Sequence, residues 1–193
     1  MMLRSFIAVE VPTEIQSAIA HSTASLKNSL PKPLVRWVAP QNVHLTLKFL
    51  GDVSPTKLEQ LAMTLKGEAA LLGMFSLSVG GLGAFPTARR ARVIWIGLEA
   101  PPALEALRRG VEAVAAQQGY DPEKRPFSPH LTIGRVGQNA SAADVVRICN
   151  GIEAAKIGAL GTFRVGAVHI FKSDLQPGGS VYIHLYALSL KPS

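Results

Sequence analysis

The sequence predicts an α+β fold in which most strands pair antiparallel. Apolar residues alternate or run together in short stretches typical of strands, and these are separated by stretches with helical spacing. The predicted order is strand, helix, two strands; helix, two strands; helix, strand; and helix, two strands, which indicates α+β. Two predicted strands share the pattern His-apolar-Thr-apolar, at residues 44–47 and 130–133. With 193 residues, 48% of them hydrophobic, the chain is long enough for one domain with a substantial core.

The N-terminal half is expected to hold two helices among five strands. Proline at residues 12 and 55 indicates the two helix starts, because proline fits the first helical turn. The glycines at residues 80–83 suggest a nucleotide loop, but neither a helix nor Gly-Lys-Ser/Thr follows, so we predict a glycine-rich bend or bulge. The predicted strands are residues 5–11, 35–38, 43–50, 75–79 and 93–98, and the predicted helices are about 13–30 and 55–72.

The C-terminal half is expected to hold two helices, the second motif strand and two further strands. Helices are predicted over about residues 101–118, capped by Gly119, and from Ser141 onward. Strands are predicted at 162–171 and 181–190, joined by a loop over 173–180. Cys149 is the only cysteine, so no disulfide can form within the chain, and we predict that it is packed rather than catalytic.

The two His-x-Thr motifs are predicted to line one site from two strands. Because alternate side chains of a strand share a face, His44 lies with Thr46 and His130 with Thr132. A third copy at residues 21–23 falls in a helical pattern, where residues i and i+2 do not face each other, so we predict an ordinary solvated histidine there. The alternative for the two motif histidines is that they are half-buried strand residues bonded to the backbone.

These motifs resemble the two-histidine (2H) phosphoesterase superfamily, and within it the bacterial and archaeal RNA 2′,3′-cyclic phosphodiesterases, also called 2′-5′ RNA ligases. The resemblance covers nearly the whole chain, with Gly134 where the family often has Ala. It implies a single bilobal domain over residues 1–193, with two antiparallel sheets flanked by helices around a central basic cleft with pseudo-two-fold symmetry. The matching residues are 4–9, Trp37, 44–51, 81–86, 93–95 and 128–135.

The resemblance implies an enzyme that opens a terminal 2′,3′-cyclic phosphate on RNA to leave a 2′-phosphate, and some members also form 2′-5′ linkages. Histidine suits both proton transfers because its unperturbed pKa is about 6.5. The resemblance makes His44 the proton donor to the leaving oxygen and His130 the base that activates water. The near-identical motifs leave this assignment open. Thr46 and Thr132 can hydrogen-bond the non-bridging oxygens. No metal or other cofactor is expected, because the sequence suggests no carboxylate–histidine cluster.

Lys48, Phe49 and Arg135 are further candidates for substrate binding. Alternation puts Lys48 on the His44 face, where it could contact phosphate. Phe49 is expected to pack in the core, with base stacking as the alternative. Arg135 resembles a family residue that assists substrate binding, but strict alternation puts it opposite His130 unless the strand ends or bulges first. His169 and His184 lack a threonine at i+2 and are predicted to be ordinary strand residues.

The net charge of +7 favours anionic partners, and the resemblance implies RNA with 2′,3′-cyclic phosphate ends, tRNA-like fragments among the candidates. Arg89, Arg90 and Arg92 form either a solvated edge loop or a phosphate-steering cluster. No apolar run approaches the roughly 18 residues of a membrane span, so we expect no membrane association. The single cysteine fits a reducing cytoplasm, where we expect the chain to be a monomer. Two other functions stay open: a non-catalytic RNA-end-binding module, or a phosphodiesterase of small cyclic nucleotides or 2′-5′ oligonucleotides.

Overall fold

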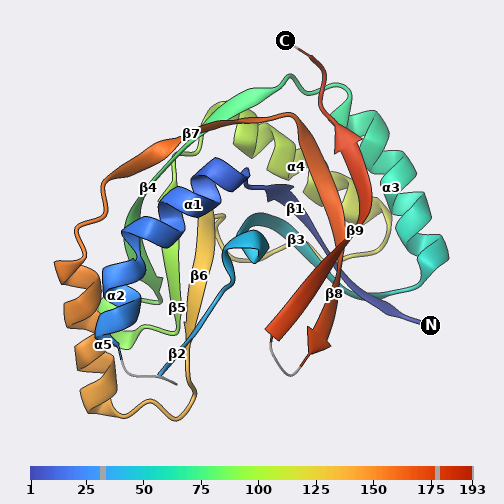
Figure 1. The fold of residues 1–193 in the computed structure, drawn as a ribbon. Helices are drawn as coiled ribbons and strands as arrows, with labels where there is room; N and C mark the ends of the chain where they lie inside the picture. The colour runs from blue at the N-terminus through green and yellow to red at the C-terminus, as the bar shows by residue number, and fades with distance from the viewer. Residues whose placement is uncertain (31–33, 177–178, 193) are drawn as a thin grey trace.

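The computed structural model describes residues 1–30, 34–176 and 179–192, and it has an α+β fold with two antiparallel sheets (Figure 1). Sheet A has four strands in the order β3-β1-β8-β9, and sheet B has five in the order β2-β6-β5-β4-β7. Every neighbouring pair of these strands runs antiparallel, so the predicted fold class is confirmed.

The chain passes back and forth between the two sheets. The strands in the described residues are β1 (Leu3–Glu10), β2 (Val35–Trp37), β3 (His44–Val53), β4 (Phe75–Phe85), β5 (Val93–Leu98), β6 (His130–Val136), β7 (Ala159–Val165), β8 (Ala167–Gln176) and β9 (Gly179–Ser189). The helices there are α1 (Thr13–Ser22), α2 (Ala24–Ser29), α3 (Pro55–Ala69), α4 (Pro102–Gln117) and α5 (Ala142–Ala154), with 3-10 turns η1 (Pro40–Asn42) and η2 (Ala88–Arg90).

One apolar core joins the two sheets. Ile7 and Leu45 from sheet A belong to the same buried cluster as Ile94 and Leu131 from sheet B. Helices α3 and α4 pack on each other and against strands of sheet A, whereas α1 contacts β7 of sheet B and α5 contacts η2 (Figure 1). A smaller cluster of Phe6, Ala8 and Phe171 covers the opposite face of sheet A. None of the helices in the described residues is long and apolar enough to cross a membrane.

The helix starts follow the predicted signals, but the first helix is interrupted. Ser54 accepts a hydrogen bond from the backbone N–H of Lys57, and Ser141 forms a capping box with Asp144. The predicted continuous helix over 13–30 is wrong, because α1 ends at Ser22 and α2 begins at Ala24. The buried Thr23 lies between them and donates its hydroxyl to the carbonyl of Ile19 at 2.7 Å, a bond that competes with regular helix.

The C-terminal strands differ most from the prediction. The single strand predicted over 162–171 is wrong, because the chain changes sheet at Gly166: β7 pairs with β4 in sheet B, and β8 pairs with β1 in sheet A. The loop predicted over 173–180 is wrong for its described part, since β8 and β9 pair as far as Gln176 and Gly179. The remainder of that predicted loop, residues 177–178, lies outside the described residues. The predicted glycine bulge is confirmed: β4 shifts register between Gly80 and Leu82, and Gly81 has φ +73.

Both motif strands carry a bulge directly after the motif. In β3, pairing with β1 skips Leu47, and in β6, pairing with β5 skips Ile133. These two residues are 86 positions apart (133 − 47), the same spacing as the two motif histidines (130 − 44). A bulge adds one residue to a strand, so the side chains that follow it change face.

Candidate active site

The motif histidines begin their strands, and those strands meet. His44 is the first residue of β3 and His130 the first of β6, and β3 and β6 contact each other near the middle of the molecule (Figure 1). Within each motif the burial alternates as predicted: the histidine and threonine are half-buried, while Leu45 and Leu131 are buried. Each imidazole therefore shares a face with its threonine.

Matching hydrogen bonds hold the two imidazoles. His44 Nδ1 lies 2.7 Å from the carbonyl oxygen of Asn42, and His130 Nδ1 lies 2.7 Å from that of Ser128. In both cases the acceptor is two residues upstream. A carbonyl oxygen only accepts, so Nδ1 carries the proton in the neutral ring, and Nε2 is left to accept or donate a proton. The backbone bonding considered as the structural alternative is thus present, but it occupies only one nitrogen of each ring.

Aromatic rings pack against both histidines. His44 stacks on Phe6 with ring centroids 4.7 Å apart and meets Tyr182 edge-on at 5.1 Å. His130 meets Phe85 edge-on at 4.8 Å. These rings remove water from the imidazoles, and loss of water disfavours the charged form.

The pKa values of both histidines lie below the ordinary value for that reason. Burial is the main cause of the lowered pKa of His44, with smaller lowering by the charges of Arg135 and His130. Burial is also the main cause of the lowered pKa of His130, with Arg135 again contributing. The backbone bonds act in the opposite direction on both pKa values. The charge of His130 would thus oppose protonation of His44.

Lys48 does not lie where alternation predicts. Because the bulge at Leu47 precedes it, Lys48 turns inward and is 7% exposed. Its ammonium group pairs with the Glu112 carboxylate at 2.8 Å and donates to the backbone oxygen of Asp121 at 2.7 Å. The prediction that Lys48 lies on the His44 face is wrong, because the side chain ties β3 to α4 and the loop that follows it.

The same two bulges bring Phe49 and Arg135 outward. Phe49 is 68% exposed, so the prediction that it packs in the core is wrong. Its ring lies 6.3 Å from that of Phe6, which stacks on His44. Arg135 is exposed, so it lies on the less buried side of β6 with His130 and Thr132, and its charge lowers the pKa of both histidines. The bulge at Ile133 explains why Arg135 is not on the face opposite His130, where strict alternation would put it.

Gly134 sits where a side chain would collide. A Cβ atom there would lie 2.8 Å from Cγ1 of Val35 and 2.9 Å from Cε3 of Trp37. These neighbours belong to β2, the strand that pairs with β6 at the edge of sheet B. The glycine thus lets β2 pack closely against the second motif strand.

The structure adds residues around His44 that sequence reasoning missed. Phe6, Phe171 and Tyr182 pack on one another beside the imidazole, and Glu10 pairs with His44 across β1 and β3. Alternation in β1 gives a signal, since Phe6 and Glu10 lie two strand periods apart. The strands β8 and β9 come from the far end of the chain, and the pairing of β8 with β1 has no local signal.

His169 and His184 are strand residues, but the prediction that they are ordinary ones misses their arrangement. Together with Glu10 they form a carboxylate–histidine cluster whose nitrogen and oxygen atoms all lie within 4.8 Å of one another. The expectation that the chain has no such cluster is therefore wrong. The predictions of a solvated His21 and a packed Cys149 are confirmed, because His21 is exposed on α1 and Cys149 is buried in α5.

The arginine cluster lies on the surface beside α5. Arg89 and Arg90 belong to η2, Arg92 follows it, and all three are exposed. They line a hollow of about 520 Å³ together with Pro86, Ala91, Ala142, Val145 and Val146. The exposed position fits either interpretation of these arginines.

Comparison with known proteins gives the family. The model of the "LigT like Phosphoesterase" family matches residues 9–95 and again residues 96–182. The chain belongs to this family. Each match contains one of the two motif strands, with His44 in the first and His130 in the second, so both halves of this LigT-like phosphoesterase resemble the same family model.

Two relatives show how far the similarity extends. An RNA 2′,3′-cyclic phosphodiesterase of Methanothermobacter thermautotrophicus is 30% identical over 190 residues, which cover 98% of this chain and 100% of the relative. The protein of the same name from Escherichia coli K12 is 37% identical over 138 residues, covering 71% of this chain and 74% of the relative.

Solved structures extend the similarity to the whole fold. A crystal structure of a phosphoesterase matches with a TM-score of 0.78 at 28% identity and covers 99% of both chains. The crystal structure of E. coli LigT complexed with 3′-AMP matches with a TM-score of 0.76 at 29% identity, covering 98% of this chain and 99% of that one.

Proposed function

We propose that this chain is an RNA 2′,3′-cyclic phosphodiesterase that hydrolyses a terminal 2′,3′-cyclic phosphate to a 2′-phosphate. The observation that carries the proposal is the matched pair of imidazoles, each held through Nδ1 by a carbonyl two residues upstream and each on a strand that contacts the other. Relatives that carry this name cover the chain almost completely, which supports the same reaction.

In the proposed mechanism the cyclic phosphate lies between the two Nε2 atoms. Neutral His130 takes a proton from water through Nε2 as the water oxygen attacks phosphorus. Protonated His44 gives its Nε2 proton to the departing 3′ oxygen, which becomes a hydroxyl while the phosphate stays on the 2′ oxygen. The Nδ1 hydrogen bond of His130 is exposed and that of His44 half-buried, which supports the assignment of His130 to the water. Formation of a 2′-5′ linkage would use the two histidines in the same roles, with a 5′-hydroxyl in place of water, and cleavage of such a linkage by the 3′-hydroxyl would exchange them.

The threonines and Arg135 complete the proposed site. Thr46 and Thr132 share the faces of their histidines, and their hydroxyl groups are proposed to donate to the non-bridging oxygens of the phosphate. The guanidinium of Arg135 offsets the negative charge that the phosphate carries in the transition state. Donors that are already in place cost no reorganisation during the reaction, which is why such groups lower the barrier.

We infer that residues 1–193 form one phosphoesterase domain of two lobes. The single buried cluster that contains residues of both sheets supports this inference. The whole domain, rather than either half, is then the unit to test. The monomeric state and the cytoplasmic location remain predictions from the sequence.

The test is hydrolysis of a 2′,3′-cyclic mononucleotide and of a short RNA that ends in a 2′,3′-cyclic phosphate, both in excess chelator. We expect His44→Ala and His130→Ala each to lower kcat by about 10²- to 10⁴-fold, the usual contribution of one acid–base group. Phosphorus NMR should identify the product as a 2′-phosphate. His21→Ala is the matched control, because His21 belongs to the third His-x-Thr sequence but is exposed on α1. Full activity of His44→Ala would remove the mechanism.

The same experiment separates the two other functions. An RNA-end-binding module, which the net charge of +7 favours, would bind the RNA in a salt-sensitive way and give no product after long incubation. A phosphodiesterase of small cyclic nucleotides would cleave the mononucleotide faster than the RNA. Cleavage of a 2′-5′-linked oligonucleotide in preference to both would indicate the remaining substrate class.

A further inference from the structure

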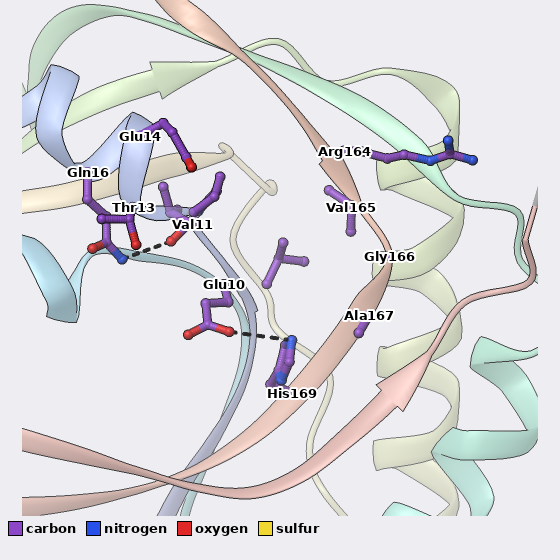
Figure 2. A pocket seen from close by; sticks show the side chains of 12 residues that line it. Glu10, Val11, Thr13, Glu14, Gln16, Arg164, Val165, Gly166, Ala167 and His169 are labelled. Carbon is purple, nitrogen blue, oxygen red and sulfur yellow. Dashed lines mark hydrogen bonds and ion pairs between the residues drawn. The ribbon is translucent and has the colours of Figure 1, made fainter.

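A second group of chemically active side chains lies on sheet A beside the histidine pair. Glu10, His169 and His184 come from β1, β8 and β9, which are consecutive strands of that sheet. His184 Nε2 lies 3.3 Å from one carboxylate oxygen of Glu10, and His169 Nε2 lies 4.0 Å from the other. Figure 2 shows the Glu10 carboxylate directed at the His169 ring. The three residues are separated by up to 174 positions in the chain (184 − 10), and the strand order alone brings them together.

The spacing of these atoms fits a metal ion. Zinc bonds to imidazole nitrogen and carboxylate oxygen at about 2.0–2.2 Å, so neighbouring ligands of a tetrahedral ion lie about 3.3–3.6 Å apart. The Nε2 atoms of His184 and His169 lie 3.3 and 4.0 Å from the two carboxylate oxygens of Glu10. With all ligand atoms within 4.8 Å of one another, this comes close to the tetrahedral arrangement. Small side-chain rotations would close the remaining gap. We propose that Glu10, His169 and His184 bind a divalent transition metal ion of the zinc type.

The state of the imidazoles suits this role. A metal ion needs a neutral ring with a free lone pair. In the described residues His169 makes no hydrogen bond, and its Nδ1 is buried without a partner. A metal ion would therefore displace only the hydrogen bond between His184 and Glu10.

The surroundings leave room for further ligands. Glu10 and His169 line a hollow of about 490 Å³ between the start of α1 and the crossing from β7 to β8 (Figure 2). Three protein ligands leave at least one position of a tetrahedral ion open, and this hollow can supply water or an anion to it. The ion would also link three adjacent strands, so its binding should stabilise the folded chain. The proposal does not rest on the proposed function, since none of its ligands is a motif residue.

The experiment is titration of the metal-free full chain with Co²⁺, followed by visible absorption, and with Zn²⁺, followed by calorimetry and thermal unfolding. We expect one equivalent of Co²⁺ with the intense bands of a four-coordinate site, and a higher Tm with Zn²⁺. Loss of one ligand should weaken binding by more than the 10–100-fold that outer-shell changes cost. His184→Ala and Glu10→Gln both remove a ligand at a position that is about half exposed, so both variants should fold.

Two control proteins locate the ion. His21→Ala removes an exposed histidine elsewhere and should bind as the unaltered chain does. A double variant with His44→Ala and His130→Ala should also bind one equivalent of Co²⁺, because neither ring belongs to the cluster. Unchanged Co²⁺ spectra in folded His184→Ala and Glu10→Gln would overturn the proposal. Loss of the ion in the double variant would overturn it too, since the motif histidines would then be the ligands.

Discussion

A carbonyl oxygen two residues upstream decides which nitrogen of each motif histidine is free. The oxygens of Asn42 and Ser128 hold Nδ1 at the same distance in both copies, so the rings present Nε2 in the same way. The residue types at 44, 46, 130 and 132 could be read from the sequence, and so could their shared faces. The tautomer could not, because it depends on the turn of the backbone before each strand.

Arg135 tests the electrostatics of this pair. Its positive charge lowers the pKa of both histidines, after the larger effect of burial, so removing the charge should raise both pKa values. The proposed mechanism uses one neutral and one protonated ring, so it predicts that kcat/KM falls below the lower pKa and above the upper one. We expect Arg135→Ala to move both limbs of the pH profile of kcat/KM to higher pH and to reduce its maximum. Arg36→Ala is the control, because Arg36 is an exposed neighbour of Arg135 on β2. Limbs that stay in place would contradict this electrostatic role.

Phe49 tests whether the site extends to a base. Its ring is 68% exposed beside Phe6, so it is free to stack on a nucleobase. Stacking on an aromatic ring is worth about 1–3 kcal/mol, so Phe49→Ala should weaken binding of an RNA end by roughly 5- to 150-fold. The Tm should hardly change, because the substitution removes little buried area. Calorimetry with a 2′-phosphate-ended oligonucleotide measures the affinity, and Leu71→Ala, which removes another largely exposed apolar residue, is the control. Equal affinities of the Phe49 variant and the original chain would exclude stacking.

At the scale of elements, the bulges explain where sequence reasoning succeeds and where it fails. Alternation is correct as far as Leu47 and Ile133, which are both buried, and it fails at the next residue because each strand has gained an extra one. No residue type at Leu47 or Ile133 marks a bulge, because both are ordinary strand residues. The pairing with β1 and β5 creates them, and that pairing is not local information.

Lys48 shows the structural consequence of the first bulge. The side chain is buried, and its removal would leave the Glu112 carboxylate and the Asp121 carbonyl without their partner. Breaking one half of a buried ion pair typically costs about 3–5 kcal/mol, and the partial exposure of Glu112 favours the lower end of this range. We expect Lys48→Met to lower the free energy of unfolding in urea and to leave kcat nearly unchanged below the Tm.

A double-mutant cycle completes that test. Adding Glu112→Gln to Lys48→Met removes the buried charge and should recover part of the stability that the single substitution removes. Exposed Lys66 on α3 provides the control, since Lys66→Met should be nearly neutral. A large loss of kcat in folded Lys48→Met would instead indicate that Lys48 contacts the phosphate of the substrate.

At the scale of the molecule, periodicity predicts the class and most elements but not the partners of the strands. The α+β class and strand β5 follow from local pattern, and helices α3, α4 and α5 begin where their prolines or capping serines indicate. The exchange of sheets at Gly166 has no such signal, because a strand has the same sequence pattern in either sheet. The cluster of Glu10, His169 and His184 could not be predicted for that reason.

The arginine cluster is testable as a property of the whole surface. Affinity for single-stranded RNA should fall with salt, with a slope that shrinks by about 0.7 for each phosphate that the protein no longer neutralises. If Arg89, Arg90 and Arg92 guide RNA, replacing all three by Ala should reduce the slope more than replacing Lys66, Lys156 and Lys191, which are also exposed and remove the same charge. Fluorescence anisotropy over a salt series measures both slopes. Equal slopes would identify the arginines as a solvated loop.

The crossing at Gly166 also bears on how the protein is made. Strand β1 lies between β3 and β8, so one of its edges is paired by an early segment and the other only by a segment near the end of the chain. During synthesis on the ribosome, one edge of β1 therefore stays unpaired until β8 has emerged, when most of the chain has been made. A nascent chain halted before β8 would already contain the His-x-Thr motifs of β3 and β6, yet it would lack the hairpin of β8 and β9 that packs beside His44.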